Sequence, residues 1–564
     1  MIASADRPLI VQSDRTVLLE VSHPRHEEAR DLLVRFAELE KSPEHIHTYR
    51  ISSLSLWNAA AAGVQPEEVI GGLNALSRYP VPDALEREIR EAMARYGRVK
   101  LVKDGQQLQL TSDDPLLLVQ FASTPELAAL MAGPPRGAAV PVDPAARGLL
   151  KAALLRAGYP VEDLAGYTPG APLRLALRSR SRQGEPFALR PYQEDASRAF
   201  YAAGGPQGGS GVVVLPCGAG KTIIGIAVMT QVQARTLILT QSQVAVHQWI
   251  RELLDHTDLP EDAVGEYTGS LKQVRPVTVT TYQILTHRNR RDEAFPHFRL
   301  FDQEEWGLII YDEVHLLPAP VFRVTADLQS RRRLGLTATL VREDGREAEV
   351  FSLIGPKKYD LPWRLLESQG WIATARCAEV RVPLPEAERM AYAVADTRER
   401  FRIAAENPDK LPVVRALLER HRGEPVLVIG QYIRQLEELS RELGAPLLTG
   451  RTAQPERERL YADFRAGAIP VLVVSKVANF AVDLPEARTA IQVSGTFGSR
   501  QEEAQRLGRI LRPKADGSPA HFYSLVTQDT REQELGEKRQ LFLTEQGYEY
   551  DLLFGAEVLA GVPR

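Results

Sequence analysis

The chain has 564 residues, of which 44% are hydrophobic and 25% charged, as in globular proteins with full-sized cores. Its 69 basic and 73 acidic residues leave a net charge of −4, which excludes nucleic-acid binding through bulk positive charge and requires a local basic groove instead. Two cysteines, Cys217 and Cys377, lack the spacing of a metal site or a disulfide framework. Without a run of about 18 apolar residues or a secretory signal, the chain is expected to be cytoplasmic, with no membrane contact.

Residues 1–96 predict a mainly helical module. Short strands are expected at 9–11 and 16–19, and apolar residues at helical spacing predict a helix over 26–39. Breaker and capping residues indicate where three further helices begin. These helices are predicted over 54–62, 66–76 and 82–96, with Ser53, Pro66 and Pro82 at their starts.

Residues 97–166 predict a small α+β domain. Two apolar segments, 99–102 and 108–110, flank a turn sequence and so predict a hairpin, and the clearest helix covers 145–157. The next stretch, 167–186, is rich in Gly, Pro, Arg and Ser. It is therefore predicted to be a linker.

Apolar strands alternate with helical segments in two consecutive series, over 187–365 and 366–564. Near-continuous apolar runs are typical of parallel strands that are covered on both faces. The runs lie at 212–215, 236–239, 277–279, 308–311 and 333–336 in the first series and at 426–429, 471–474, 490–493 and 521–525 in the second. The sequence therefore predicts an α/β fold with two parallel-sheet domains in tandem.

A phosphate-binding loop is predicted within residues 211–222, where an apolar strand runs into a glycine turn and then a helix. The glycines let backbone N–H groups face the phosphates, Lys221 is predicted to reach the β and γ phosphates, and Thr222 to bind Mg²⁺. Leu215 stands where the usual pattern has its first glycine. The predicted ATP contacts of this loop are Pro216, Cys217, Gly218, Ala219, Gly220, Lys221 and Thr222.

Two acidic residues and a histidine follow the apolar run 308–311. Ligands of open α/β sheets bind at the carboxyl ends of the strands, which is where Asp312 and Glu313 are placed. Asp312 is predicted to bind Mg²⁺, Glu313 to orient the attacking water, and His315 to link this site to the next motif. Together the two motifs predict an ATPase with ATP and Mg²⁺ as cofactors.

A basic helix over 501–512 is predicted to complete the catalytic set. Arg506, Arg509 and Arg512 recur on one helical face. An arginine that reaches the γ phosphate from another domain can raise the rate about 10³–10⁵-fold, and it makes domain closure depend on ATP. Arg509 and Arg512 are the predicted catalytic arginines. The alternative is an ordinary solvated basic face.

The motifs, in this order, resemble those of superfamily 2 helicases. Several stretches narrow the resemblance to the bacterial form of XPB-type DNA repair helicases, and the match covers nearly the whole chain. The stretches are Pro8–Arg15, Leu189–Gln193, Leu215–Lys221, Asp312–His315, Leu334–Asp344, Ser475–Pro485 and Gln505–Arg509.

The resemblance implies that the two parallel-sheet domains are tandem RecA-like motor domains. It implies an ATP-dependent helicase or translocase that moves 3′ to 5′ on DNA in nucleotide excision-type repair or transcription. It implies that 97–166 is a damage-recognition domain. The family's basic helical thumb has its candidate here at 386–407, which is short and not strongly basic. The resemblance also assigns roles to single residues. These are ATP contacts by Arg190, Gln193, Asp483 and Gln505, coupling by Thr337, Ala338 and Thr339, and strand separation by Arg342, Glu343 and Asp344.

Loop ends that follow predicted strands are candidates for holding DNA. Tracking along DNA without sequence preference relies on contacts with the phosphate backbone. Taken singly, such residues are more often helix caps or turn residues, but their position after strands, where helicases have their DNA motifs, favours DNA contact. The predicted contacts are Thr240, Gln241, Ser242, Thr281 and Tyr282 in the first motor domain and Arg451, Ser475 and Lys476 in the second.

Other functions stay open on the sequence alone. An ATP-switched clamp on damaged DNA, or a double-strand translocase with little unwinding, needs the same nucleotide motifs. An RNA helicase is disfavoured by Arg342–Asp344 and by the N-terminal domains. The expected partners are DNA and a repair nuclease or another repair protein, and the chain is expected to be a monomer.

Overall fold

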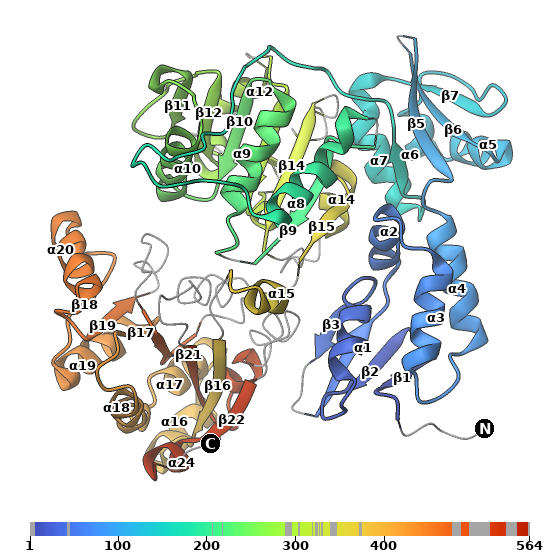
Figure 1. Cartoon of the computed structure of the whole chain (residues 1–564). Coiled ribbons are helices and arrows are strands. Elements are labelled where there is room, and N and C mark those ends of the chain that lie inside the picture. Colours follow the sequence, from blue (N-terminus) through green and yellow to red (C-terminus); the bar gives the residue numbers. More distant parts are fainter. Residues whose placement is uncertain are drawn as a thin grey trace.

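The computed structural model arranges the described residues as four β-sheets with their covering helices (Figure 1). It describes all residues except a set of terminal and internal stretches. These are 1–5, 42–44, 106, 206, 217, 288–295, 303–304, 319, 322–324, 326–327, 329–330, 339–346, 362, 372–374, 476–486, 496–518, 537–549 and 562–564.

The N-terminal module combines an antiparallel sheet, of order β1-β2-β4-β3, with four helices. Its elements are β1 (Leu9–Val11), β2 (Thr16–Glu20), α1 (His26–Leu33), β3 (Glu38–Lys41), β4 (Ile46–Arg50), α2 (Ser53–Ala61), α3 (Pro66–Leu76) and α4 (Asp83–Ala94). The helix predicted over 26–39 is wrong at its end, because Leu39 pairs with Tyr49 across β3 and β4. The cap of α2 is Ser52 rather than Ser53, since the Ser52 hydroxyl accepts from the Ser55 N–H at 3.0 Å.

The small domain confirms the predicted hairpin as the antiparallel pair β5 (Val99–Asp104) and β6 (Gln107–Ser112). Strand β8 (Val161–Asp163) pairs in parallel with β5, so the sheet order is β7-β6-β5-β8. The remaining elements are α5 (Pro115–Ser123), α6 (Pro125–Ala128), β7 (Ala139–Val142) and α7 (Arg147–Arg156), which matches the predicted helix.

The first motor domain is built on a seven-stranded sheet of order β11-β12-β10-β13-β14-β9-β15, in which every pair is parallel. All five predicted apolar runs are strands of this sheet. The apolar runs did not predict the two edge strands, β11 and β15. Strand β15 carries charged residues and β11 is short, so neither forms an apolar run. The elements are α8 (Pro191–Tyr201), β9 (Ser210–Val214), α9 (Lys221–Val232), β10 (Thr236–Thr240), α10 (Gln243–His256), β11 (Val264–Tyr267), β12 (Val277–Thr281), α11 (Tyr282–Leu285), α12 (Arg299–Asp302), β13 (Leu308–Asp312), β14 (Arg332–Thr337), α14 (Glu347–Leu353) and β15 (Lys357–Asp360).

The second motor domain repeats this plan with the parallel order β18-β19-β17-β20-β21-β16-β22. Its four predicted runs are strands, and the prediction of two tandem parallel sheets is confirmed. The elements are α15 (Trp363–Ser368), β16 (Ala375–Val382), α16 (Glu386–Val394), α17 (Thr397–Ala405), α18 (Lys410–Arg420), β17 (Val426–Gly430), α19 (Ile433–Leu443), β18 (Leu447–Leu448), α20 (Gln454–Arg465), β19 (Val471–Ser475), β20 (Thr489–Gln492), β21 (Ala520–Thr527), β22 (Tyr550–Phe554) and α24 (Gly555–Leu559).

The segment predicted as a linker, 167–186, lies against the first motor domain. Figure 1 shows it crossing that domain before it enters α8. Leu175 is buried in the core of the motor domain, the Leu173 N–H donates to the Gln233 carbonyl at 3.0 Å, and Leu177 forms a β-bridge with Thr257. Apolar residues among its glycines and prolines therefore attach this segment to the motor domain.

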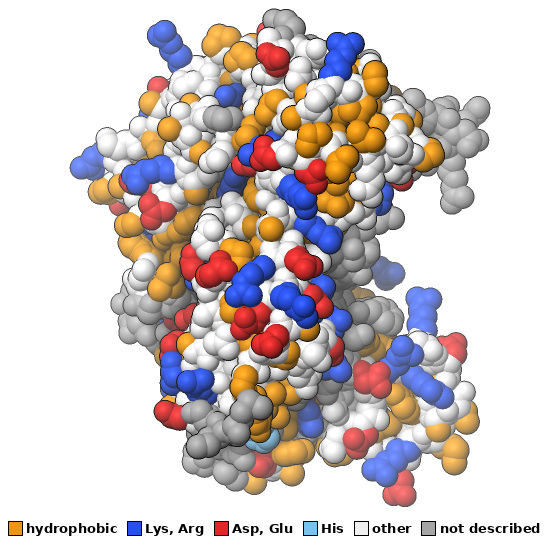
Figure 2. Space-filling model, turned by 90° about the vertical axis from the view of Figure 1, so that its right-hand side faces the viewer, with side chains coloured by type: hydrophobic (Ala, Val, Ile, Leu, Met, Phe, Trp, Pro, Cys, Tyr) orange, Lys and Arg blue, Asp and Glu red, His pale blue; other side chains and the backbone are white. Residues whose placement is uncertain are grey.

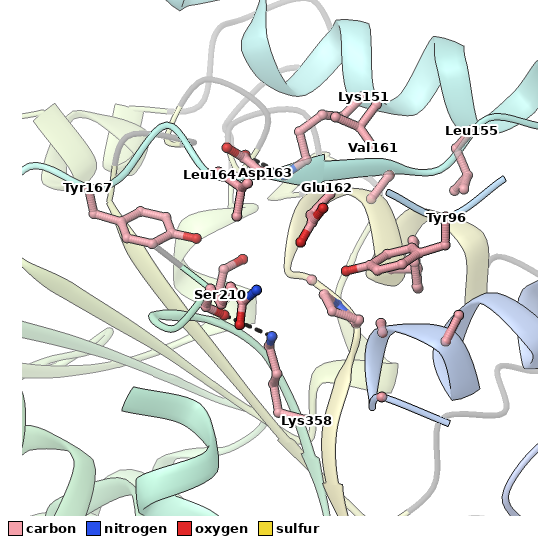
Figure 3. A pocket seen from close by; sticks show the side chains of 18 residues that line it. Tyr96, Lys151, Leu155, Val161, Glu162, Asp163, Leu164, Tyr167, Ser210 and Lys358 are labelled. Atoms are coloured by element: carbon pink, nitrogen blue, oxygen red, sulfur yellow. Dashed lines mark hydrogen bonds and ion pairs between the residues drawn. The ribbon is translucent and has the colours of Figure 1, made fainter. Parts of the chain in front are cut away.

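The N-terminal module and the small domain meet the first motor domain near β15. Trp57 from α2, Leu155 from α7 and Phe351 from α14 form one buried cluster. The Lys357 N–H donates to the side-chain oxygen of Asn58 at 3.0 Å. A cavity of about 230 Å³ lies at this junction, and Figure 3 shows that its lining side chains come from all three units.

A buried charge cluster closes one side of the junction (Figure 3). Asp163 accepts hydrogen bonds from Arg147 at 2.6 Å and from Lys151 at 3.0 Å. Burial alone would raise the pKa of Asp163, but the charges of Lys151 and Arg147 and their hydrogen bonds hold it well below its usual value. The Tyr167 ring then joins this cluster to the motor domain, because the guanidinium groups of Arg147 and Arg333 lie 5.6 and 5.7 Å from its centroid.

On the face that Figure 2 draws, Lys and Arg side chains are interspersed with Asp and Glu over the described residues. This mixture agrees with the near-balance of 69 basic and 73 acidic residues. Among the described residues, no helix is long and apolar enough to cross a membrane.

We expect Asp163→Asn to lower the free energy of unfolding by about 3 kcal/mol, because it removes the negative charge that compensates the buried charges of Arg147 and Lys151. Since the folded-state pKa of Asp163 lies below the ordinary 3.8, its stabilisation is complete above about pH 4 and is lost on acidification. The deficit of the variant should therefore shrink as the pH falls below about 4. Urea unfolding followed by tryptophan fluorescence measures both effects.

The matched control is Glu126→Gln, which removes an ion pair with Arg156 in the same domain. Both of these side chains are 64% exposed, so the change should cost about 0.5 kcal/mol or less. Equal losses in the two variants would contradict the special weight given to the Asp163 cluster.

Candidate active site

The glycine turn after β9 has the backbone geometry that phosphate binding requires. Gly218 and Gly220 have φ values of 82° and 75°, in the left-handed region that favours glycine, and Gly220 caps α9. The first N–H groups of α9, which have no acceptor within the helix, point toward the turn. Leu215 is fully buried, and its N–H donates to the Thr337 carbonyl at 2.9 Å, which ties the turn to β14.

Lys221 and Glu313 face each other across the turn. The Lys221 Nζ lies 3.4 Å from Glu313 Oε1 and 3.5 Å from the Leu215 carbonyl oxygen. Glu313 has a φ of 49°, a left-handed conformation that is costly for a residue with a side chain and that clusters at functional sites. This backbone turn directs the carboxylate at the end of β13 toward the phosphate-binding turn.

Asp312 is held at three points. Its Oδ2 accepts from Trp249 Nε1 at 2.9 Å, its Oδ1 accepts from the Glu313 N–H at 3.1 Å, and its carbonyl accepts from the Tyr282 hydroxyl at 2.8 Å. Burial, together with the negative charge of Glu313, raises the pKa of Asp312 to about 6. The carboxylate is thus oriented, and keeping it ionised costs free energy.

His315 connects the acidic residues to β14. Its Nδ1 lies 2.6 Å from the Thr337 hydroxyl oxygen and 3.5 Å from Glu313 Oε2. Thr337 and Ala338 are buried. Close contacts therefore run without a break from Lys221 through Glu313 and His315 to Thr337. The coupling role of His315, Thr337 and Ala338 stays a prediction, and Thr339 lies outside the described residues.

Arg190 and Gln193 lie beside the same turn, at the start of α8. The Gln193 Oε1 accepts from the Arg190 N–H at 2.9 Å, and its Nε2 donates to the Ala219 carbonyl at 3.4 Å. The Arg190 guanidinium lies 4.6 Å from the ring centroid of Trp371, which sequence reasoning missed. Tyr192, also missed, donates to the Ala219 carbonyl at 2.8 Å.

The predicted DNA contacts divide into buried and accessible side chains. Thr240, Thr281, Tyr282 and Ser475 are buried, and the hydroxyls of Thr240 and Tyr282 donate to the Thr280 and Asp312 carbonyls. Thr281 and Ser242 cap α11 and α10, while Arg451 is exposed and Gln241 half-buried. At the four buried positions, any contact with DNA falls to backbone groups.

Several predicted residues lie outside the described part of the chain. They are Cys217, Thr339, Arg342, Glu343, Asp344, Lys476, Asp483, Gln505, Arg506, Arg509 and Arg512. The contribution of the second motor domain to the nucleotide site, and the strand-separation element, therefore stay predictions. Pro216, Gly218, Ala219, Gly220 and Thr222 all lie in or directly after the glycine turn.

A phosphate-binding turn beside an Asp-Glu pair, on the first of two tandem parallel sheets, defines the P-loop class of helicase motor. Family models agree along the chain: "ERCC3/RAD25/XPB C-terminal helicase" matches 366–560, "Type III restriction enzyme, res subunit" matches 186–342, and "Helicase conserved C-terminal domain" matches 9–133. The chain belongs to the XPB family of helicases, and the resemblance drawn from its motifs is confirmed.

The similarity to curated relatives extends over whole chains. The "DNA 3'-5' helicase XPB" of Kineococcus radiotolerans is 55% identical, over 99% of this chain and 98% of that protein. The protein of the same name from Mycobacterium tuberculosis is also 55% identical, with 97% of each chain covered. The "General transcription and DNA repair factor IIH helicase/translocase subunit XPB/SSL2" of Saccharomyces cerevisiae is 32% identical, over 99% of this chain and 73% of that protein.

We expect Asp312→Asn to raise the stability of the nucleotide-free protein by about 1–3 kcal/mol at neutral pH, because the raised pKa means that folding opposes ionisation of this carboxyl. Folded-state protonation sets in near pH 6 and unfolded-state protonation near 3.8, so the gain should be full above about pH 6 and vanish below about 4. Urea unfolding over this pH range measures the gain.

The control is Asp113→Asn, which removes the same charge from an exposed position. Its effect should stay within about 0.5 kcal/mol at every pH. A loss of stability in Asp312→Asn at pH 7 would contradict the expected cost of the buried charge.

Proposed function

We propose that the chain is an ATP-dependent DNA helicase or translocase of 3′–5′ polarity that opens or remodels duplex DNA in nucleotide excision-type repair or transcription. The observation that carries the proposal is the close set of Lys221, Glu313 and His315 beside a glycine turn of phosphate-binding geometry. The names of relatives 55% identical over nearly the whole chain support the DNA substrate and the polarity.

The nucleotide would bind with its phosphates against the glycine turn and the start of α9. Lys221 binds the β and γ phosphates, exchanging its contact with Glu313 for the phosphate oxygens. Thr222 and Asp312 are the residues that would hold Mg²⁺, and their hydroxyl and carboxylate oxygens are the ligand types this ion prefers. The bound ion would neutralise charge that develops on the phosphates.

Glu313 is the group that orients the attacking water and accepts its proton. Its left-handed backbone and its contacts with Lys221 and His315 fix the carboxylate before substrate arrives, which lowers the cost of reaching the reactive geometry. When Lys221 turns to the phosphates, this carboxylate becomes available to the water. Arg509 and Arg512 would supply positive charge from the second motor domain.

His315 and Thr337 pass the state of the nucleotide to the rest of the motor. Their contact at 2.6 Å joins the end of β13 to the end of β14, immediately before Ala338 and Thr339. A shift of Glu313 on hydrolysis therefore acts directly on the strand end that leads toward Arg342–Asp344, the proposed strand-separation element.

DNA would run across the carboxyl ends of both sheets and be held through its phosphates. Helix starts at α10 and α11 offer N–H groups, and exposed Arg451 offers positive charge. The small domain at 97–166 is the proposed damage-recognition unit, and helices α16 and α17 are the proposed thumb. A repair nuclease or another repair protein is the proposed partner of a monomeric motor.

We expect Glu313→Gln to keep ATP binding but to lower hydrolysis by at least about 10³-fold, because the amide cannot accept a proton from water. Fluorescent-nucleotide binding and phosphate release measure the two steps separately. Glu305→Gln, at a residue before β13 in the same domain, is the control and should hydrolyse ATP normally. Turnover retained in Glu313→Gln would refute the role given to this carboxylate.

We expect DNA, and not RNA, to stimulate ATP hydrolysis, with the stimulation falling steeply as salt rises because DNA binding releases counterions. Phosphate release with single-stranded DNA, duplex DNA and RNA measures the preference, and duplexes with 3′ or 5′ tails measure unwinding and its polarity.

Stimulation by RNA equal to that by DNA would contradict the proposed substrate. Full stimulation by duplex DNA without release of a tailed strand would favour the alternative of a damaged-DNA clamp or double-strand translocase. Turnover that ignores polynucleotide altogether would remove support for a motor of either kind.

A further inference from the structure

A tryptophan on α10 points at one carboxylate of the candidate active site. The Trp249 side chain is 1% exposed, and its Nε1 donates to Asp312 Oδ2 at 2.9 Å. The other carboxylate oxygen, Oδ1, accepts from the Glu313 N–H at 3.1 Å. Each oxygen of Asp312 therefore has one fixed donor, and lone pairs remain on both for a metal ion.

The position of the indole is set by packing on both sides. Val246, Trp249 and Leu253 form the buried face of α10, so the helix directs the indole into the domain. A Cβ atom placed on Gly225, in α9, would lie 2.5 Å from Trp249 Cη2. The helix that begins at the phosphate-binding turn thus has a glycine where the indole packs, and this contact locks the ring in its orientation.

The chemistry of the donor suits a residue that orients a metal ligand. An indole N–H donates one hydrogen bond and cannot accept one, ionise or bind the metal itself. It can therefore hold a carboxylate without competing with it. Groups that hydrogen-bond to metal ligands commonly contribute about 10–100-fold to metal affinity or activity.

We propose that Trp249 is a positioning residue for Asp312, which it fixes in the orientation that receives Mg²⁺ with the nucleotide. The proposal rests on the proposed ATP site, in which Asp312 is the metal-binding carboxylate. It extends that site to α10, a helix that follows the predicted DNA contacts at Gln241 and Ser242. A movement of α10 would change the orientation of Asp312 through a single hydrogen bond.

Trp249→Phe tests the proposal, because it keeps the aromatic ring and removes the N–H group. The readout is the Kd of N-methylanthraniloyl-ADP, measured with Mg²⁺ and again with EDTA on the full chain. We expect the gain in affinity that Mg²⁺ gives to fall about tenfold, with the Kd in EDTA unchanged within about twofold. In ATP hydrolysis, the Mg²⁺ concentration giving half-maximal rate should rise about tenfold, while kcat at saturating Mg²⁺ changes less.

Trp306→Phe is the matched control. Trp306 is also fully buried, its Nε1 donates to the Leu300 carbonyl at 2.8 Å, and it lies just before β13, whereas Asp312 ends that strand. The control loses an indole hydrogen bond and some stability. Its increase in nucleotide affinity on addition of Mg²⁺, the Mg²⁺ gain, should equal that of the wild type. The same loss of Mg²⁺ gain in both variants, or in neither, would overturn the proposal.

Gly225→Ala is a second, independent variant. It improves helix propensity, yet its methyl group must displace the indole. We expect it to reduce the Mg²⁺ gain by several-fold without unfolding the domain, and a wild-type gain in this variant would count against the orienting role of the ring. Wild-type protein whose nucleotide affinity does not respond to Mg²⁺ at all would instead overturn the proposed ATP site.

Discussion

The structure of the candidate nucleotide site depends on a buried carboxylate, that of Glu313, held between Lys221 and His315. A charge of this kind is costly to remove from water and is tolerated only where partners compensate it. Here the partners are 3.4 and 3.5 Å away, and each comes from a segment with its own role at the site. The left-handed backbone of Glu313 adds a further cost, which the strand before it, buried from Leu308 to Tyr311, can sustain.

The order of strands brings these residues together. Strand β9 pairs with β14, and β14 pairs with β13, all in parallel, so the three carboxyl ends are neighbours at one edge of the sheet. Adjacent strands lie about 4.8 Å apart, which places the glycine turn, Thr337 and Asp312 within reach of one another. The bond from the Leu215 N–H to the Thr337 carbonyl continues the pairing beyond β9 and holds the turn in this register.

Much of this arrangement could be predicted from the sequence, because it depends on local patterns. Buried parallel strands appear as apolar runs, and a glycine turn before Lys-Thr has few structural uses besides phosphate binding. The contributions of Trp249 and Trp371 could not be predicted, because an indole in a helix or loop gives no sign of which group its ring will meet. The helix predicted over 26–39 failed for a related reason: Leu39 is buried in either conformation, and only its pairing with Tyr49 decides between them.

The attachment of the N-terminal units bears on how the motor would work. Asn58, Trp57 and Leu155 reach β15 and α14, and the charge cluster around Asp163 continues through Tyr167 to Arg333 on β14. These contacts are buried and directional, so both units are fixed to the first motor domain. When the two motor domains close on a nucleotide, a unit fixed to one of them moves as part of that body. A damage-recognition unit held in this way would be carried along DNA with each closure. Arg333, which attaches this unit, and Thr337, at the candidate nucleotide site, lie near opposite ends of β14. One strand therefore connects the attachment of the N-terminal units to the candidate nucleotide site.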